Sequence, residues 1–220
     1  MADNLPAHEQ PHAVARGDKM RLGFFGGSFD PPHRGHLTVA LAAAKRFGLE
    51  RVLLAPTARQ PLKPEGPVAT FGDRLEMVRL LCKGSAGLEA SAVDAPVADG
   101  LPNYTIDTLE RLRRTLGTED VIFFIVGVDA FLGLRRWRAP AELLAVAEWI
   151  VVTRPGFAVE RLAELALNEA QRARMHLLDG VAEEVSATQI REALREGRDC
   201  AGLLSPAVLA YIRERRLYGA

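Results

Sequence analysis

The residues with the clearest capacity for chemistry are two histidines three positions apart, His33 and His36. They close the string GGSFDPPHRGH, residues 26–36. A glycine pair directly after an apolar run lets backbone N–H groups approach a phosphate chain, and a helix beginning just beyond points its positive end at the same place. Gly35 removes a side chain between the histidines, so both rings can face one ligand. The segment predicts a phosphate site, although it is neither a Walker loop nor the GxGxxG motif.

Plainer interpretations of this segment stay open at this point. A glycine pair after a strand is often only a tight turn, and two histidines at this spacing can be half of a metal site. The remaining histidines are His8, His12 and His176, of which the first two fall within the first twenty residues. A zinc site is therefore not predicted. Asp30 is expected to order the proline turn that follows it.

Further candidate residues each have a structural alternative. The segment 56–69 is long and proline-rich for a connection, and is a candidate substrate loop. Asp129 follows an apolar strand, where open parallel sheets bind ligands, but it could equally cap the next helix. Trp137 suits stacking on a flat ring or covering the core at a helix edge. Ser186 and Arg191 fit a helix start that binds phosphate, or an ordinary capped helix.

The elements that must position these residues follow from short apolar runs alternating with amphipathic segments. This alternation predicts an α/β fold with a doubly wound parallel sheet. The run at 121–126 is apolar on both faces, as in a buried parallel strand. Predicted strands cover residues 21–25, 51–55, 88–93, 121–126, 148–153 and 175–178. Predicted helices cover residues 35–47, 70–82, 104–116, 158–174, 187–196 and 206–216.

Composition narrows the class of protein. The chain has 220 residues, with 28 Lys and Arg against 28 Asp and Glu, which argues against a broad nucleic-acid or membrane surface. No apolar run approaches the ~20 residues that span a bilayer. Two isolated cysteines exclude a disulfide framework and fit a reducing compartment. We expect a cytoplasmic protein with a flexible N-terminal arm over 1–20 and one domain over 21–220, in which 185–220 form a small helical part.

Several strings together resemble a known family. Residues 26–36 resemble the HxGH signature of the nucleotidylyltransferase superfamily, with its GGSFDP lead-in. The match narrows to bacterial nicotinate-mononucleotide adenylyltransferases through NYTIDTL (103–109), FIVGVD (124–129) with Trp137, VVTRPG (151–156), VSATQIR (185–191) and the ending at 204–218. The resemblance extends from about Arg21 to Tyr218. One departure is Leu62, which stands where the family's P-P-H-K/R loop has histidine, while Lys63 keeps the cation.

The resemblance implies a Rossmann-like nucleotidylyltransferase fold and an activity. The reaction is adenylyl transfer from ATP to nicotinate mononucleotide, giving deamido-NAD and pyrophosphate by direct in-line attack of the mononucleotide phosphate. That phosphate is already ionised, so no general base is needed, and catalysis is positioning plus charge stabilisation. Mg²⁺ is expected with the triphosphate. No nucleic-acid or membrane partner is expected, and a homo-oligomer is left open.

The same resemblance assigns roles to residues. The implied catalytic residues are His33, His36, Lys63 and Arg191. The implied ATP-binding residues are Gly26, Gly27, Ser28, Phe29, Gly35, Gly127, Asp129, Ser186 and Thr188. The implied nicotinate-nucleotide-binding residues are Tyr104, Thr105, Trp137 and Arg154, and no metal ligand is assigned. The alternatives are an adenylyltransferase preferring nicotinamide mononucleotide or another phosphate monoester, and a non-catalytic adenine-nucleotide-binding module.

Overall fold

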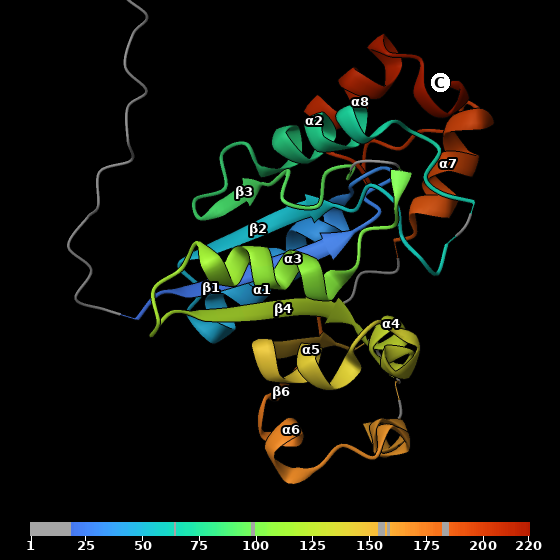
Figure 1. Ribbon diagram of the computed structural model, residues 1–220. Helices are drawn as coiled ribbons and strands as arrows, with labels where there is room; N and C mark the ends of the chain where they lie inside the picture. The colour runs from blue at the N-terminus through green and yellow to red at the C-terminus, as the bar shows by residue number, and fades with distance from the viewer. Residues whose placement is uncertain (1–18, 64, 98–99, 154–156, 158, 182–184) are drawn as a thin grey trace, which may run out of the picture.

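A six-stranded parallel sheet forms the centre of the protein (Figure 1). The computed structural model describes residues 19–63, 65–97, 100–153, 157, 159–181 and 185–220. The strand order is β3-β2-β1-β4-β5-β6, and every neighbouring pair is parallel. The strands are β1 (Arg21–Gly27), β2 (Arg51–Pro56), β3 (Leu88–Ala90), β4 (Val121–Gly127), β5 (Glu148–Val152) and β6 (Met175–Leu178). The chain therefore runs outward from β1 to β3 and then returns to place β4 beside β1, as in a Rossmann-like fold.

Helices cover both faces of the sheet, and each face has its own apolar core. On one face lie α1 (Arg34–Phe47), α2 (Phe71–Cys82), α7 (Ala187–Arg195) and α8 (Pro206–Glu214). On the other lie α3 (Thr105–Arg114), α4 (Val128–Leu132), α5 (Pro140–Val146) and the 3-10 helix η3 (Val159–Leu165). The remaining elements are α6 (Glu169–Ala173) and the 3-10 helices η2 (Leu134–Arg136) and η4 (Leu217–Gly219). None of the helices described is long and apolar enough to cross a membrane.

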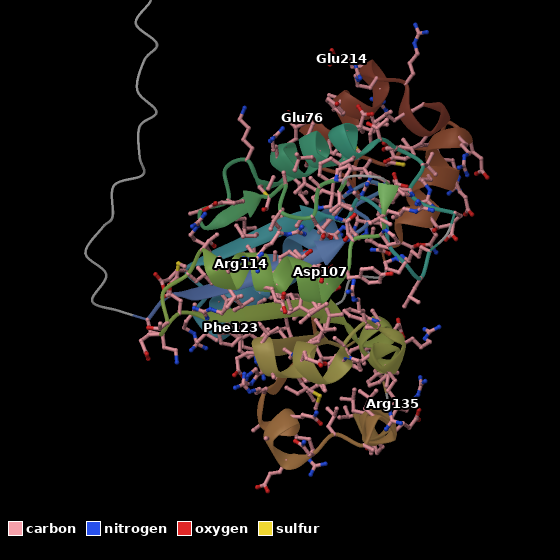
Figure 2. The ribbon with its side chains drawn as sticks, in the orientation of Figure 1. Glu76, Asp107, Arg114, Phe123, Arg135 and Glu214 are labelled. Carbon is pink, nitrogen blue, oxygen red and sulfur yellow. The ribbon has the colours of Figure 1, made fainter. Side chains whose placement is uncertain are left out.

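The central strand β4 explains why its sequence is apolar throughout. Phe123 and Ile125 belong to one core, whereas Phe124 and Val126 belong to the other. Because successive side chains of a strand point to opposite faces, a strand covered on both sides must be apolar at every position. Figure 2 shows Phe123 on this strand, while the exposed Arg114 lies on the outer side of α3.

Two sequence predictions about elements are wrong, and three short helices were not predicted. The helix predicted over 158–174 is η3 followed by α6, because Ala166 takes a left-handed φ of 47° and Asn168 starts a new helix by accepting the backbone N–H of Gln171. The strand predicted over 88–93 ends at Ala90. The pattern also gives no bounds for α4, η2 and α5, which are too short for helical periodicity to show.

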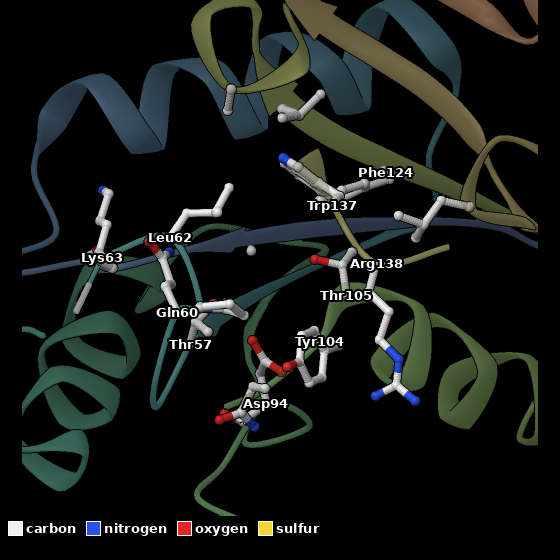
Figure 3. Close-up of a pocket in the computed structure, with 18 of the residues that line it drawn as sticks. Thr57, Gln60, Leu62, Lys63, Asp94, Tyr104, Thr105, Phe124, Trp137 and Arg138 are labelled. Carbon is white, nitrogen blue, oxygen red and sulfur yellow. Dashed lines mark hydrogen bonds between the residues drawn. The ribbon is translucent and has the colours of Figure 1, made fainter. Parts of the chain in front are cut away.

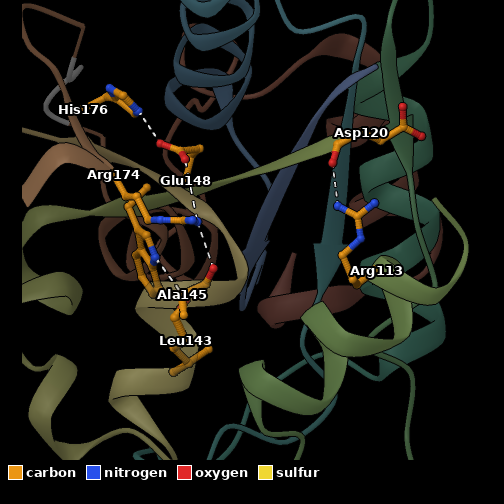
Figure 4. A network of polar contacts seen from close by, with 8 residues as sticks. Arg113, Asp120, Leu143, Ala145, Glu148, Arg174 and His176 are labelled. Carbon is orange, nitrogen blue, oxygen red and sulfur yellow. Dashed lines mark hydrogen bonds and ion pairs between the residues drawn. The ribbon is translucent and has the colours of Figure 1, made fainter. Parts of the chain in front are cut away.

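The amino edge of the sheet is closed by polar contacts (Figure 4). At the start of β5, Glu148 Oε2 lies 2.9 Å from His176 Nε2, and Arg174 extends toward the same carboxylate. Just before β4, Asp120 accepts the backbone N–H of Met20 at 2.9 Å. Residues 1–18 of the predicted arm lie outside the described residues, whereas Met20 is buried. These contacts join the amino ends of neighbouring strands to one another. A ligand is therefore expected at the opposite edge, where the strands have their carboxyl ends.

Candidate active site

A cavity of about 420 Å³ opens at the carboxyl edge of the sheet, where β1 and β4 lie side by side (Figure 3). This is where the strand order of a doubly wound sheet reverses, so the loops leaving the two strands diverge to opposite faces. The walls come from both strand ends, the loop after β2, the segment before α3 and the segment between α4 and α5. The predicted site residues that line the cavity are Gly26, Gly27, Ser28, Lys63, Tyr104, Thr105, Gly127 and Trp137.

The turn that leaves β1 brings the two histidines together. His33 occupies the N-cap of α1, and the centroids of the His33 and His36 rings are 3.7 Å apart. The backbone N–H of His33 donates to Nδ1 of His36 at 3.2 Å. A Cβ added at Gly35 would lie 3.2 Å from Nδ1 of His33, so glycine is what allows this ring to lie against the helix start. One of the backbone N–H groups at the start of α1 is not available to a phosphate. The N–H of Arg34 donates to the carbonyl of Leu203 at 2.9 Å.

His36 is held in its neutral form. Its ring packs against Phe29 and Phe25, with centroids 4.7 and 5.9 Å away. Burial, and to a smaller extent the nearby His33, lower the pKa of His36 well below its ordinary value. Since Nδ1 accepts a hydrogen bond, the proton of the neutral ring is on Nε2. The turn therefore offers an uncharged N–H donor throughout the neutral pH range.

Arg191, far along the chain, lies against the same turn. Its Nη1 donates to the backbone carbonyl of Asp30 at 2.7 Å, and its Nη2 donates to Oγ1 of Thr188 at 3.2 Å. Its Nε is buried with no hydrogen-bond partner. Ser186 occupies the predicted N-cap position of α7, although its side chain makes no capping bond. A guanidinium fixed by two contacts at the turn is suited to binding phosphate oxygens.

The loop after β2 is fastened to the turn by a buried cation. Arg74 is 1% exposed, and its Nη1 donates to the carbonyls of Ser28 and Thr57, at 2.6 and 2.9 Å. This loop carries Lys63 and Leu62 to the cavity, where Leu62 is 49% exposed. Among the described loop residues that line the cavity, Lys63 is the cation that can meet an anion, and Gln60 is a second polar group.

The far wall of the cavity is aromatic and carries a cation. Trp137 packs on Phe124 and Trp149, with centroids 6.0 and 6.2 Å away, and its other surface lines the cavity. Tyr104 occupies the N-cap of α3, and the Arg138 guanidinium carbon lies 4.7 Å from the centroid of its ring. Trp137 therefore covers the core, as one of its two interpretations predicted, while its stacking on a flat ring stays a prediction. This wall fits a flat ring that carries negative charge.

Comparison with known proteins decides the family. The sequence model of the family described as Cytidylyltransferase-like matches residues 24–193. A protein of Gloeobacter violaceus named probable nicotinate-nucleotide adenylyltransferase is 42% identical over 90% of this chain and 96% of its own length. The chain belongs to this nucleotidyltransferase family. A relative of the same name from Solibacter usitatus (strain Ellin6076) is 38% identical over 90% of this chain and 100% of its own length.

A solved structure agrees on the fold of this family member. The nicotinic acid mononucleotide adenylyltransferase of Plasmodium falciparum, complexed with NaAD, superposes with a TM-score of 0.70 at 16% identity, covering 91% of this chain and 98% of that chain. The predicted doubly wound nucleotidylyltransferase fold is therefore confirmed.

The remaining predicted site residues lie outside the cavity lining. His33, His36, Gly35 and Arg191 lie in or against the adjoining turn. Phe29 is only 1% exposed as a whole residue and packs on His36, so it supports the turn from the core, and its contact with ATP stays a prediction. Asp129, Ser186 and Thr188 are exposed at helix starts, and Arg154 falls outside the described residues. The capping alternative for Asp129 is wrong, because Gly127 is the N-cap of α4.

Sequence reasoning missed the buried charges and the cations beside Trp137. Arg136 and Arg138 both line the cavity, and the string RRWR was the available signal. Arg74 stands in an apolar helix face, where a charge normally needs a partner. Asp30 accepts hydrogen bonds from distant segments that no local pattern indicates, and its ordering of the proline turn stays a prediction.

Proposed function

We propose that this chain transfers the adenylyl group of ATP to nicotinate mononucleotide. A phosphate oxygen of the mononucleotide attacks the α-phosphorus of ATP and forms the new P–O bond. The bond between the α-phosphorus and the oxygen bridging to the β-phosphate breaks, and that oxygen leaves with pyrophosphate. The other product is deamido-NAD, an intermediate of NAD biosynthesis. Because the attacking oxygen is already ionised, no group on the chain has to remove a proton.

The observation that carries this proposal is the common wall between the histidine turn and the aromatic cavity. Gly26, Gly27 and Ser28 line the cavity on one side and lead directly into the turn that holds His33 and His36. A dinucleotide has one flat ring at each end and phosphates between them. The aromatic cavity would take the nicotinate ring, and the adjoining turn, rich in N–H donors and cations, would take the phosphates next to it.

The residue roles follow from charge and position. The Nε2–H of His36, with His33 and Arg191, would stabilise charge on the triphosphate, and Lys63 would meet it from the opposite loop. The nicotinate ring would stack on Trp137, beside Tyr104 and Thr105. Gly127 and Asp129 would contact the adenosine, together with Ser186 and Thr188, and Arg154 remains a predicted nucleotide contact.

A covalent intermediate is not needed for this chemistry, and the cysteines are unsuited to form one. Cys82 and Cys200 are both buried. Burial raises the pKa of the Cys82 thiol to about 11, so it is not a thiolate at neutral pH. We further expect the chain to act in the cytoplasm, where such thiols stay reduced.

Mg²⁺ is expected to enter with ATP. Across the residues that the structure describes, no three His, Cys, Asp or Glu side chains gather into a metal site. Phosphate oxygens and water would therefore be the main ligands, the usual arrangement for Mg²⁺ with nucleotides. When bound, the ion neutralises part of the triphosphate charge, and the described cations neutralise the rest.

The decisive experiment compares acceptors with the purified chain, ATP and Mg²⁺. Pyrophosphate release and dinucleotide formation are measured with nicotinate mononucleotide, nicotinamide mononucleotide and phosphopantetheine. The highest kcat/KM is expected with nicotinate mononucleotide. Higher kcat/KM with another acceptor would reassign the substrate, and no pyrophosphate with any of them would contradict the reaction.

A further inference from the structure

A tyrosine from the 3-10 helix after α8 reaches the histidine turn. Tyr218 is 6% exposed, and its hydroxyl donates to Oδ1 of Asp30 at 2.7 Å. The two residues are 188 positions apart in the chain. Asp30 stands three residues before His33, and it is itself only 4% exposed. The contact therefore joins the last helical segment to the segment that carries both histidines.

Asp30 joins two further segments at the same point. Its carboxylate accepts the backbone N–H of Val68 at 2.7 Å and that of Ala69 at 3.1 Å, from the loop that presents Lys63. Its backbone carbonyl accepts Nη1 of Arg191 at 2.7 Å. One buried residue thus connects the lysine loop, the arginine of α7 and the histidine turn, which together hold the four predicted catalytic side chains.

The backbone around Tyr218 is held in an uncommon conformation. Tyr218 and Arg216 both have left-handed φ values, 60° and 50°. Such values cost energy for residues other than glycine and persist where the surroundings enforce them. A Cβ at Gly219 would lie 3.3 Å from Cγ of Arg195, so the segment passes close against α7. Burial, and then the charge of Asp30, raise the pKa of the Tyr218 hydroxyl, which therefore remains a protonated donor.

We propose that Tyr218 is a positioning residue for adenylyl transfer. By holding one oxygen of Asp30, it orients the carboxylate so that both oxygens keep the lysine loop against the histidine turn. The inference rests on the proposed function, because the distance between Lys63 and the histidines matters only if both act on one triphosphate. Small displacements of such groups lower the rate of a reaction that proceeds by positioning.

The chain offers a matched control for the loss of this hydroxyl. Tyr211, in α8, donates its hydroxyl to Oδ1 of Asp73 at 2.9 Å. Like the bond from Tyr218 to Asp30, this bond joins a tyrosine to an aspartate far away in the sequence. Its acceptor, however, lies in α2 and not in the histidine turn. Tyr218→Phe and Tyr211→Phe each delete one such bond and keep the ring. Any effect specific to Tyr218→Phe therefore comes from Asp30.

The test measures loop protection and kinetics in the full chain. Hydrogen–deuterium exchange of peptides containing Val68 and Ala69 should become faster in Tyr218→Phe and stay unchanged in Tyr211→Phe. In Tyr218→Phe, kcat should fall about tenfold, the change that loss of one ordinary hydrogen bond would cause in the transition state. The KM values should move less than about threefold, since uniform binding is kept. The melting temperatures of both variants are measured first, and the assays are run at a temperature at which both variants are folded.

The possible results separate this inference from the proposed function. Unchanged exchange at Val68 and Ala69, or equal losses of kcat in both variants, would overturn the role of Tyr218. A wild-type chain that forms no dinucleotide would overturn the proposed function. In that case an exchange difference confined to Tyr218→Phe would still establish the link through Asp30, while the catalytic role of that link would be refuted.

Discussion

The rings of His33 and His36 lie with their centroids 3.7 Å apart, and the backbone of His33 donates to Nδ1 of His36. Two protonated rings at this distance would repel each other, and this is one reason why the pKa of His36 is low. The pair therefore works as one neutral donor beside a second ring, not as two imidazolium ions. In the proposed reaction, Lys63 and Arg191 are the residues expected to supply positive charge to the triphosphate, together with Mg²⁺.

Replacing His36 by alanine should nearly abolish turnover without unfolding the protein. The change removes the Nε2–H donor, and loss of one oriented donor to a developing charge lowers kcat by about a hundred- to a thousandfold. The ring is partly buried against Phe29, so a modest fall in melting temperature is expected as well. Steady-state kinetics and circular dichroism are measured together.

The control is His176→Ala, which removes a histidine at the amino edge of the sheet. Its kcat should match that of the wild type. A folded His36→Ala variant with wild-type kcat would refute the role assigned to His36.

The low pKa of His36 also predicts how stability depends on pH. In the unfolded chain the residue protonates near its ordinary pKa of about 6.5, whereas in the folded chain it stays neutral to lower pH. Below about 6.5 the unfolded state therefore binds more protons, and stability falls with falling pH. When the pH is lowered from about 8 to about 5.5, the melting temperature of the wild type should fall further than that of His36→Asn, because asparagine does not titrate in this range. If the melting temperatures of the two proteins fall equally with pH, the folded chain does not hold the His36 ring neutral.

The local part of this site could be predicted from the sequence. The glycine pair, the prolines and the two histidines form one turn because they are consecutive, and the carboxyl ends of parallel strands bring Gly26 and Gly127 to one edge. The alternation of strand and helix patterns likewise predicted a parallel sheet, although the order of its strands is known only from the structure. These features depend on neighbouring residues or on a general rule of parallel sheets.

The long-range part could not be predicted. The bonds from Arg74 to Ser28 and from Tyr218 to Asp30 join segments whose relative placement depends on how α2 and η4 pack. Helical periodicity gives no signal for a buried arginine in α2 or for a buried tyrosine in η4. Their partners follow only from the tertiary structure.

Gly127 tests where the nucleotide lies. Its φ is −68°, and a Cβ there would meet no atom of the chain within 4 Å, although the residue lines the cavity. Gly127→Ala should therefore leave the melting temperature nearly unchanged while raising the KM for ATP, by about tenfold if the methyl group displaces the ligand slightly. The control is Gly72→Ala in α2, where the nearest atom is 3.9 Å away and activity should be unaffected. An unchanged KM for ATP in Gly127→Ala would place the nucleotide elsewhere.

Arg138 tests what distinguishes nicotinate from nicotinamide. Arg138 lines the cavity, and its guanidinium lies over the Tyr104 ring and 3.6 Å from Oδ2 of Asp107, so a partly neutralised positive charge borders the aromatic wall. A carboxylate gains from this charge and an amide does not. Arg138→Gln should lower the ratio of kcat/KM values for nicotinate and nicotinamide mononucleotide by about tenfold, the effect of one partly screened charge pair. Arg114→Gln makes the same change in net charge at an exposed position on α3, and its ratio should stay at the wild-type value. If both variants keep the wild-type ratio, selection for the acid depends on backbone N–H groups of the cavity wall and not on this side chain.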